Sequence, residues 1–371
     1  MLQYITSGES HGKYLIAILE GIPSGLSVNT ALINKELRRR QEGYGRGPRM
    51  DIEKDQVMIT SGLIKGKTTG APIGLMIINK DVTVDSLPQL LRPRPGHADF
   101  AGALKYDQGI REVLERSSAR ETALRVAVGA LCKQLLQKFN INIISHVVRI
   151  GTVNINHPNL TFEMVKKMIK ASRLNCISRE VEKRMIKEIN QAMKRNDTLG
   201  GEFEVFANGV PVGLGSYVHH MRKLDAAIAQ GLMSIQAVKA VEFGLGVGYA
   251  AASGSRAHDE LFYAKGKGYY RKTNNAGGIE GGMSNGSDII VRATMKPIAT
   301  LKRPLLSVNM KTKKTDSASF ERSDICAVPS CSVIAEGVVA YEITRAFLEK
   351  FGGDSLTEIT RNYKGYIRQI K

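Results

Sequence analysis

The sequence contains no tryptophan, and aromatic side chains make up only 6% of its residues. Proteins that read single-stranded nucleic acid stack bases on aromatic side chains, and no RRM, KH or helix-turn-helix signature is present here. These absences argue against a nucleic-acid-binding protein. That alternative keeps one supporting feature, a net charge of +18, which attracts anions of any kind. Phosphorylated metabolites would suit the same charge, so composition alone leaves the anion open.

Cysteine is also scarce. The four cysteines stand at positions 132, 176, 326 and 331 and form no CxxC pair. Zinc sites need closely spaced ligands, so this spacing disfavours a zinc site, and we expect no metal. A few unpaired thiols are typical of a reducing compartment, and we expect a cytoplasmic protein. Cys132 falls within a helical apolar pattern and is predicted to be a core residue.

Long hydrophobic runs are missing. The longest, such as 75–78 and 338–341, are far shorter than a bilayer span, and no charged and apolar leader opens the chain. We therefore expect no membrane partner. Low-complexity linkers and short-period repeats are missing as well. A length of 371 residues permits two ordinary domains, but a single domain over residues 1–371 is the simpler interpretation.

The apolar periodicity predicts a mixture of helices and strands. Helical patterns cover 30–41, 119–139, 162–195, 224–238 and 333–351, and strand-like runs cover 2–5, 141–150, 202–210, 261–265 and 288–296. Strands and helices do not alternate in the rhythm of a parallel sheet. The sequence therefore favours an α+β fold with antiparallel sheets over a doubly wound fold.

The basic residues fall into two groups. Those of residues 162–195 lie on the polar side of an amphipathic pattern and are predicted to be ordinary surface charges, and the basic stretch 302–314 is predicted to be a loop. Other arginines stand among glycine, proline, serine and histidine, where the guanidinium fork suits phosphate and carboxylate oxygens. These are Arg38, Arg39, Arg40, Arg46, Arg49, Arg92, Arg94, Arg116, Arg120 and Arg322. Pairing with a neighbouring acid is the alternative for each of them.

A helix N-terminus is predicted at Ser118. Ser118 and Glu121 have the spacing of a capping box, and an apolar helical stripe follows. Free N–H groups and the helix dipole favour an anion there, and Ser117, Arg116 and Arg120 stand beside it. A plain capping serine would explain Ser118 but not the two arginines.

The glycine-rich stretch 273–286 matches neither of the common nucleotide cradles. No Gly-Lys-Ser/Thr follows it, and it lacks the GxGxxG spacing between a strand and a helix. It permits close approach of the backbone to a flat ligand, but glycine-rich turns alone are a weak signal.

Two of the seven histidines stand out by their surroundings. His11 lies between glycines after the first predicted strand, and His97 follows the loop of Arg92 and Arg94. Histidine exchanges protons near neutral pH, so both are candidate proton carriers, with a structural role as the alternative. The remaining histidines are predicted to be structural or surface residues: His146, His157, His219, His220 and His258.

Taken together, these segments resemble the chorismate synthase family. The matching stretches are 8–12, 37–46, 94–99, 115–122, 222–226, 273–286, 295–298 and 321–324. Each motif is short, but they occur in the family's order and cover nearly the whole chain, so the ordered set is specific.

The resemblance implies a lyase that converts 5-enolpyruvylshikimate 3-phosphate to chorismate and phosphate, the last common step towards the aromatic amino acids. It implies a requirement for reduced FMN, although the reaction has no net redox change. It also implies a β-α-β sandwich, with antiparallel sheets around a helical core, and a homotetramer made of two dimers. NADPH is the candidate reductant, but no Rossmann-type domain is visible, so an outside supply of reduced flavin is favoured.

The family's functional residues carry over to this sequence by position. Those that contact the flavin are Arg116, Ser117, Ser118, Gln236, Ala237, Gly281, Lys296, Pro297, Ile298, Ala299, Thr300 and Arg322. Those assigned to the substrate or a nicotinamide nucleotide are Arg40 and Arg46, with Ser10, Arg49 and Arg120 as companions. Two positions depart from the family pattern: Gln236, where Asn or Pro is commoner, and Ala299, where Pro is frequent. Backbone contacts would tolerate both departures.

The resemblance also implies three proton carriers. His11 would stand at the leaving phosphate, His97 near flavin N1 and Asp324 near flavin N5. Arginines and a protonated His11 would neutralise the charge of the departing phosphate, which is usually the largest catalytic effect. A flavin reductase without lyase chemistry is the alternative that shares the flavin residues. The conjunction of His11, Arg40 and Arg46 favours the lyase.

Overall fold

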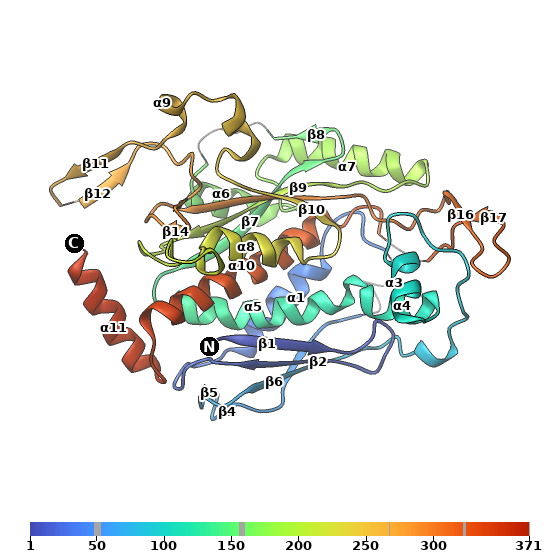
Figure 1. The fold of residues 1–371 in the computed structure, drawn as a ribbon, viewed down its shortest axis with the longest axis horizontal. Coiled ribbons are helices and arrows are strands. Elements are labelled where there is room, and N and C mark those ends of the chain that lie inside the picture. Colours follow the sequence, from blue (N-terminus) through green and yellow to red (C-terminus); the bar gives the residue numbers. More distant parts are fainter. Residues whose placement is uncertain (48–52, 156–159, 267, 322–323, 371) are drawn as a thin grey trace.

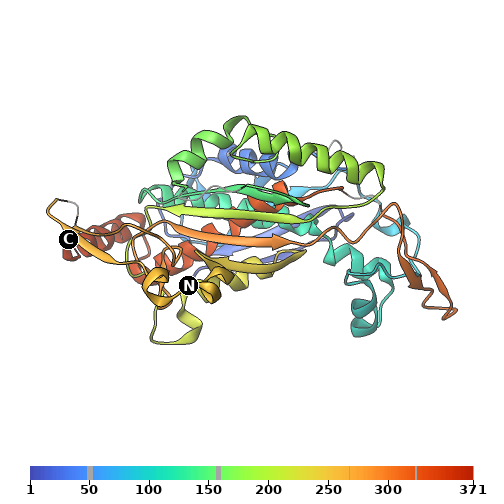
Figure 2. The ribbon, with the colours of Figure 1, turned by 90° about the horizontal axis from the view of Figure 1, so that it is seen from above.

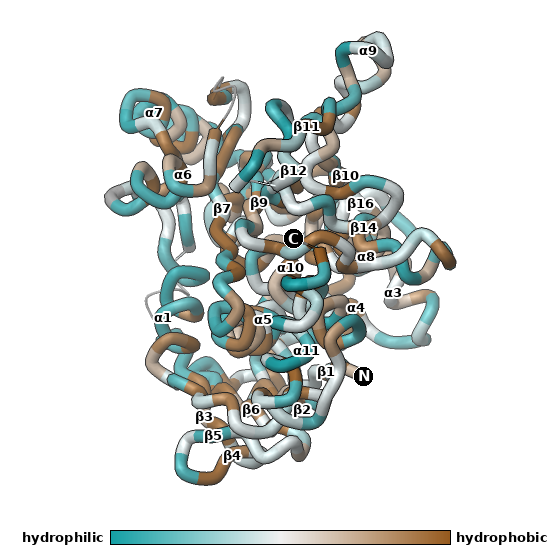
Figure 3. Tube along the Cα trace, turned by 90° about the vertical axis from the view of Figure 1, so that its left-hand side faces the viewer, coloured by the Kyte–Doolittle hydropathy of each residue, from teal (hydrophilic) through white to brown (hydrophobic). Residues whose placement is uncertain are grey.

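The structure is a computed structural model that describes residues 1–47, 53–155, 160–266, 268–321 and 324–370. Two antiparallel sheets enclose a layer of helices (Figure 1). The first sheet has the strand order β1-β2-β6-β3, and the second has the order β10-β15-β9-β7-β8. Figure 3, turned by 90°, shows α1, α5 and α10 between the sheets. The predicted α+β class and the β-α-β sandwich are confirmed.

The sheets and the helical layer are built from three sets of elements. The first sheet contains β1 (Gln3–Ser7), β2 (Tyr14–Glu20), β3 (Val57–Ile59) and β6 (Ile73–Ile78). The second contains β7 (Asn142–Ile150), β8 (Val153–Asn154), β9 (Gly201–Asn208), β10 (Val238–Phe243) and β15 (Ile289–Met295). The central helices are α1 (Thr30–Gln41), α5 (Thr122–Gln137), α8 (Leu224–Met233) and α10 (Val328–Phe351).

Strand β2 shows how the sequence sets the inner face of the first sheet. Its buried residues Leu15, Ala17 and Leu19 alternate with exposed ones, and β2 packs against α5. Successive side chains of a strand point to opposite faces, so the residues between them, Ile16 and Ile18, face outward. The outer face of this sheet is therefore apolar.

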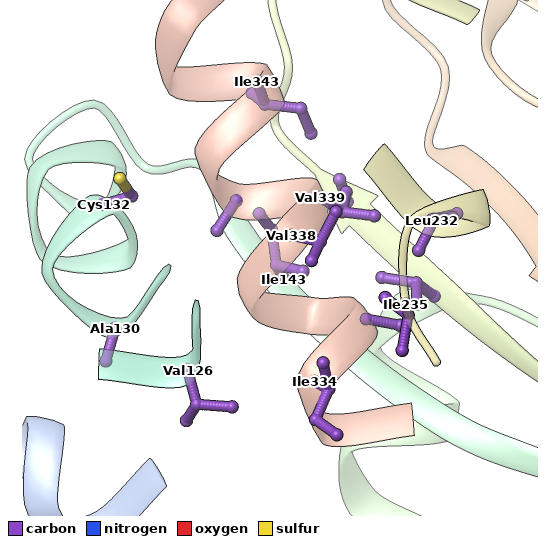
Figure 4. Close-up of a cluster of buried hydrophobic side chains, with 14 of the residues drawn as sticks. Val126, Ala130, Cys132, Ile143, Leu232, Ile235, Ile334, Val338, Val339 and Ile343 are labelled. Carbon is purple, nitrogen blue, oxygen red and sulfur yellow. The ribbon is translucent and has the colours of Figure 1, made fainter. Parts of the chain in front are cut away.

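The helical layer depends on a close approach of α5 and α10. A Cβ built on Gly129 would lie 2.2 Å from Cα of Gly337, so the two helices touch backbone to backbone. Around this contact, apolar side chains from α5, α8, α10 and β7 meet in one core; Figure 4 shows Val126, Leu232 and Val338 among them.

The remaining elements lie outside the sandwich. Helices α6 (Phe162–Met168) and α7 (Arg179–Lys194) follow the β7–β8 edge of the second sheet (Figure 2). The others are α3 (Asp99–Tyr106), α4 (Ile110–Ser117), α9 (Gly254–Ala257), α11 (Leu356–Gln369), β4 (Leu63–Ile64), β5 (Lys67–Thr68), β11 (Leu261–Ala264), β12 (Gly268–Arg271), β13 (Ile279–Glu280), β14 (Met283–Ser284), β16 (Leu306–Val308) and β17 (Thr315–Ser317). Figure 2 shows α3, α4 and the β16–β17 hairpin at one end and α11 with the β11–β12 hairpin at the other.

Most predicted elements are present, with three corrections. The pattern over 162–195 is two helices, because the segment between α6 and α7 turns away and its backbone N–H groups at Arg173 and Leu174 donate to Glu182. The helix predicted over 224–238 ends at Met233, and Val238 already belongs to β10. The loop predicted over 302–314 contains strand β16. The surface position of the lysines on α6 and α7 is confirmed, and so is Cys132 as a core residue with a free thiol.

Candidate active site

The candidate site lies at one end of the first sheet, where two loops meet. Because β1, β2 and β6 run antiparallel in turn, the loop between β1 and β2 and the segment after β6 emerge at the same end. Asn79 N–H donates to Lys13 O across this end at 3.0 Å. Gly8 starts the loop with φ of 108°, and a Cβ there would lie 2.3 Å from a backbone oxygen of β2. This geometry presents Ser10 and His11 to α4.

His11 is held by Glu115 of α4. Its ring Nδ1 lies 2.9 Å from Oε1, and its backbone N–H donates to Oε2 at 2.8 Å. Ser10 N–H donates to Glu115 O at 2.9 Å, and Ser10 Oγ lies 3.1 Å from Ser118 Oγ. The other ring nitrogen of His11 lies 4.0 Å from Asp81 Oδ2. Burial raises the pKa of Glu115, but the hydrogen bonds from His11 outweigh burial, so the pKa is lowered overall.

Asn79 joins the His11 loop to Arg120. Its amide nitrogen donates to Gly12 O at 2.6 Å, with longer contacts of 3.3 and 3.4 Å to the carbonyl oxygens of Glu9 and Ser10. Its Oδ1 accepts from Nε and Nη2 of Arg120 at 3.0 and 2.7 Å. The side chain is only 2% exposed. One buried amide therefore couples the position of Arg120 to that of the loop.

Arg40 and Arg120 share the carboxylate of Asp55. Nη1 of Arg120 donates to Oδ2 at 2.8 Å, and Nη1 of Arg40 donates to the same oxygen at 3.2 Å. Arg40, near the end of α1, also donates to Ala119 O at 3.1 Å. Both arginines are 4% exposed. Burial lowers the pKa of Arg40 to about 10, against the opposing effect of Asp55, and Arg40 remains charged at neutral pH.

The loop after α1 brings Arg46 to Asp324. Nη1 of Arg46 lies 2.6 Å from Oδ2, and Gly47 N–H donates to Oδ1 at 2.6 Å. Ile325 N–H donates to Gly45 O at 2.9 Å, so the two segments run side by side. The carboxylate of Asp324 is thereby held from two sides. For Arg40, Arg46 and Arg120, pairing with an acid is what the structure shows.

A second group surrounds His97. Nδ1 of His97 lies 2.5 Å from Oδ1 of Asp99, and Arg94 donates to both oxygens of the same carboxylate at 2.8 and 2.9 Å. Asp99 is fully buried. Burial raises its pKa, but the hydrogen bonds from Arg94 and His97 outweigh burial and hold it well below the usual range. Arg94 also donates to Thr300 Oγ1 at 2.9 Å, and Lys296 Nζ donates to Gly96 O, so the loop after β15 closes on this group.

The residues around His97 and those around Arg46 and Asp324 are joined through the backbone next to β9. Leu199 N–H donates to Ile325 O at 2.9 Å, beside Asp324. The neighbouring Thr198 Oγ1 donates to Ile298 O at 2.8 Å, within the loop after β15. The predicted site residues of the loops 8–12, 40–46, 94–97, 117–120, 296–300 and 324 thus lie along one continuous set of contacts at the α3–α4 end of the molecule (Figure 1).

The predicted capping box at Ser118 is half right. Ser118 Oγ accepts from Arg120 N–H at 3.3 Å, but it caps the 3₁₀ turn η2 (Ala119–Glu121) that precedes α5. Glu121 does not bond back to Ser118. Its carboxylate pairs with Arg125 at 3.0 Å and accepts from Thr6 Oγ1 at 3.1 Å. The reason is that Arg125, one turn further along, offers Glu121 a charged partner.

Comparisons with known proteins show which family the chain resembles. A family model described as chorismate synthase matches residues 2–348. The chain is 50% identical over 382 residues to a chorismate synthase of Alkaliphilus oremlandii and 51% identical over 391 residues to one of Geotalea daltonii; each comparison covers 100% of both chains. A solved structure titled as the crystal structure of chorismate synthase superposes with a TM-score of 0.83 and 40% identity, and covers 100% of this chain and 98% of the other.

The chain belongs to the chorismate synthase family. It is therefore an enzyme, a lyase, and the resemblance found in the sequence is confirmed. No helix within the described ranges is long and apolar enough to cross a membrane. Nor do the described residues include a group of three or more His, Cys, Asp or Glu side chains placed to hold a metal ion.

Several residues assigned to the flavin from the family have features that fit a bound polar ligand. In the described part of the chain, Ser117 Oγ and Gln236 Oε1 are buried without a hydrogen-bond partner. Ala237 has φ of 69°, a strained conformation for a residue with a Cβ, and its carbonyl accepts from Lys296 N–H at 2.9 Å. Buried polar atoms are normally satisfied, so these orphaned atoms favour a ligand that completes them.

Two predicted flavin residues, Arg116 and Gly281, have other surroundings. Arg116 is exposed and donates to the carbonyl oxygens of Thr6 and Gly8 at 2.9 and 3.3 Å. Gly281 lies beside the start of α8, where Leu224 N–H donates to Gly282 O, whereas Ala237 follows the end of that helix. A helix of 10 residues is about 15 Å long, so Gly281 and Ala237 lie near opposite ends of α8.

Two predictions, Arg49 and Arg322, lie outside the described residues, as does His157. Sequence reasoning also missed residues that the structure places in the site: Asp55, Asn79, Asp81, Asp99 and Glu115. Asp99 and Glu115 fall inside motifs that carry the family resemblance, so they could have been found. Asn79 follows an apolar run and gives no signal of its own.

Proposed function

We propose that this chain converts 5-enolpyruvylshikimate 3-phosphate to chorismate and phosphate by 1,4-elimination, and that it requires reduced FMN. The observation that carries the proposal is the convergence of His11, three arginines and Asp324 at one end of the first sheet. Phosphate departure needs positive charge where negative charge develops, and elimination needs a separate group that receives a proton.

The three arginines that carry the charge are Arg40, Arg46 and Arg120. They bind the anionic groups of the substrate, while their carboxylate partners Asp55 and Asp324 keep them fixed and limit the net charge in its absence. Preorganised charges cost no reorganisation during the reaction, which is why such an arrangement accelerates it. His11 then serves as the acid that protonates the departing phosphate.

Asp324 is the candidate for relaying the proton that leaves the substrate, because Gly47 N–H and Arg46 hold its carboxylate in one orientation. His97 is held by Asp99 in the second group, close to the loop after β15. There it would donate a hydrogen bond to the ring system of the cofactor and help to orient it.

FMN would be held by Ser117, Ser118, Gln236, Ala237, Lys296, Pro297, Ile298, Ala299, Thr300, Arg116 and Arg322. A reduced flavin bound there would supply an electron-rich ring to the allylic system of the substrate. The orphaned atoms of Ser117 and Gln236 support this assignment. We propose that reduced flavin comes from outside the chain, with NADPH as the alternative reductant.

Self-association, as a homotetramer, belongs to the same proposal. The outer face of the first sheet exposes a row of large apolar side chains, an arrangement typical of a covered surface. These are Ile5, Tyr14, Ile16, Ile18, Met58 and Ile78. Gly281 can reach a flavin only in the site of another copy, since it is far from Ala237 in its own. One large core that includes residues of both sheets and of the central helices supports a single domain over 1–371, and four buried free thiols support a cytoplasmic location.

The test is an anaerobic assay that combines the chain, chemically reduced FMN and 5-enolpyruvylshikimate 3-phosphate. We expect phosphate release and chorismate absorbance. His11→Ala should lower kcat by about 10²–10⁴-fold, the usual range for loss of an acid or base. Asp324→Asn should lower it as well, and His219→Ala, on an exposed loop, is the matched control.

Three results would contradict the proposal. Folded wild-type chain that releases no phosphate excludes the reaction. Full activity of His11→Ala at neutral pH removes the acid role, and full activity of Asp324→Asn removes the relay. Consumption of NADPH by the chain with FMN, together with no phosphate release from the substrate, would instead support the flavin reductase.

A further inference from the structure

Glu115 binds both the ring and the backbone of His11. One carboxylate oxygen faces Nδ1 at 2.9 Å, and the other accepts the backbone N–H of the same residue at 2.8 Å. The backbone carbonyl of Glu115 accepts a third bond, from Ser10 N–H at 2.9 Å. A single residue of α4 thus fixes both the path of the loop and the rotation of the imidazole.

The carboxylate decides where the imidazole carries its proton. Glu115 is ionised at neutral pH, because the hydrogen bonds that it accepts and the charge of Arg111 outweigh the effect of burial on its pKa. An ionised carboxylate only accepts hydrogen bonds, so Nδ1 of His11 must carry a hydrogen. The second nitrogen, Nε2, is then the atom that gains or loses the exchangeable proton.

We propose that Glu115 is a positioning residue that fixes His11 in the Nδ1–H form, so that Nε2 is the atom that passes the proton to the leaving group. The inference deepens the proposed function, on which it rests for the role of His11. In this proposal Glu115 needs no contact with the substrate. It acts through His11, as a carboxylate does when it orients a histidine in other acid–base sites.

The surroundings make Glu115 rigid. It is 5% exposed, and α4 is anchored by Arg111, whose Nε donates to Pro88 O at 3.1 Å and whose Nη2 donates to Glu321 at 2.8 Å. Among the described residues, Asp81 is a second acid near the ring, at 4.0 Å from Nε2. It lies on the opposite side of the imidazole from Glu115, so it cannot replace Glu115 at Nδ1.

The variant Glu115→Gln tests whether Glu115 positions the His11 imidazole, because it keeps the packing of the side chain. The shape is retained, but the amide has one accepting oxygen and one donating nitrogen. The backbone N–H of His11 is always a donor, so it takes the amide oxygen, and the amide nitrogen must face Nδ1. An amide N–H that faces Nδ1 requires an Nδ1 without a hydrogen. The ring hydrogen then lies on Nε2, and His11 cannot become the doubly protonated imidazolium that acts as the acid.

The experiment compares wild type, Glu115→Gln and a control, Glu112→Gln. Glu112 is on the same helix but is exposed and accepts only from exposed Gln89 among the described residues. We expect Glu115→Gln to lower kcat by about 10²–10⁴-fold with little change in KM, because orientation acts on the proton transfer rather than on substrate binding. Glu112→Gln should match wild type in both.

A spectroscopic measurement makes the test independent of activity. Magic-angle-spinning NMR of protein labelled with ¹⁵N-histidine reports which ring nitrogen is protonated, and His11→Asn identifies the His11 signals among those of seven histidines. We expect a protonated Nδ1 in the wild type and a bare Nδ1 in Glu115→Gln. If Glu115→Gln does not fold, the wild-type spectrum alone decides.

Wild type with a bare Nδ1 at His11 would overturn the inference, and so would full kcat in folded Glu115→Gln. Failure of the proposed function is distinguishable, because a chain that releases no phosphate still gives the His11 spectrum. The expected spectrum together with a selective loss of kcat in Glu115→Gln supports the inference.

Discussion

The buried arginines of this chain depend on hydrogen-bond partners that compensate their charge. Arg40 and Arg120 are nearly inaccessible, and each relies on Asp55 or Asn79 for hydrogen bonds. An unpaired buried charge would cost several kcal/mol, so the acids are needed for the arginines to be there at all. The sequence showed arginines in glycine-rich loops but not their partners, since Asp55 and Asn79 are distant from Arg120 in the chain.

Glu342 of α10 is a buried acid outside the site. It is 8% exposed, and Nη2 of Arg345 lies 2.8 Å from Oε2 without a hydrogen-bond alignment. Burial raises its pKa to about 7, against the lowering effect of Arg345. The folded state therefore keeps a proton that the unfolded state, with a pKa near 4.5, gives up. Folding stability must fall as pH rises between these two values.

Glu342→Gln should remove this dependence on pH. Glu342 of the wild type is protonated in both the folded and the unfolded state below about pH 4.5, and ionised in both above about pH 7. The difference in free energy of unfolding between variant and wild type therefore changes only between these two pH values. The variant should gain stability relative to wild type over this range, by roughly 3 kcal/mol at most. Chemical denaturation at pH 4.5, 6 and 8 measures it, with Glu349→Gln on the same helix as the exposed control. A constant difference across pH would contradict the prediction.

At the scale of elements, the helical layer depends on the crossing of α5 and α10. The sequence predicted helices over 119–139 and 333–351, but not that they would touch through glycines. Sequence periodicity predicts which face of a helix is buried, whereas the distance between two helices depends on which residues meet at their crossing point. Gly129 and Gly337 let the backbones come close enough for the core of Figure 4 to close.

Gly129→Ala should destabilise the chain by about 3 kcal/mol or more, at the upper end for overpacking, because the added Cβ meets backbone rather than a flexible side chain. Gly365→Ala is the matched control. It lies within α11 with nothing within 4 Å of its Cβ position, and alanine there should add about 0.5–1 kcal/mol of stability. Thermal and denaturant unfolding compare the two. Equal stability of both variants would show that the helices can separate without cost.

At the scale of the whole molecule, the outer face of the first sheet exposes apolar side chains to solvent in the single chain. Its register places Ile18 opposite Ile5 and Ile16 opposite Met76, which forms a continuous apolar surface across three strands. An isolated chain would leave this surface in water. A second copy of the chain is the occupant that the proposed homotetramer supplies.

Ile18→Lys should weaken that assembly. A charge without a partner in the covered interface would cost about 2–5 kcal/mol, enough to shift the chain towards smaller species. Sedimentation velocity over a range of concentrations measures the change, and Met193→Lys on the exposed side of α7 is the control. An Ile18→Lys chain with the wild-type sedimentation profile would exclude this face as the interface.

The sequence by itself determined the α+β class, the central helices, several strands of the two sheets and the membership of the family, because periodicity and ordered motifs are local properties. It also supplied the candidate site residues. Only the tertiary structure decided that His11 pairs with Glu115, that Arg40 and Arg120 share Asp55, and that Gly281 stands apart from Ala237. These relations join residues distant in the chain, and they depend on strand register, loop exit points and helix length. The sequence also left β2 and β6 unassigned, because the apolar outer face hides the alternation of an exposed sheet.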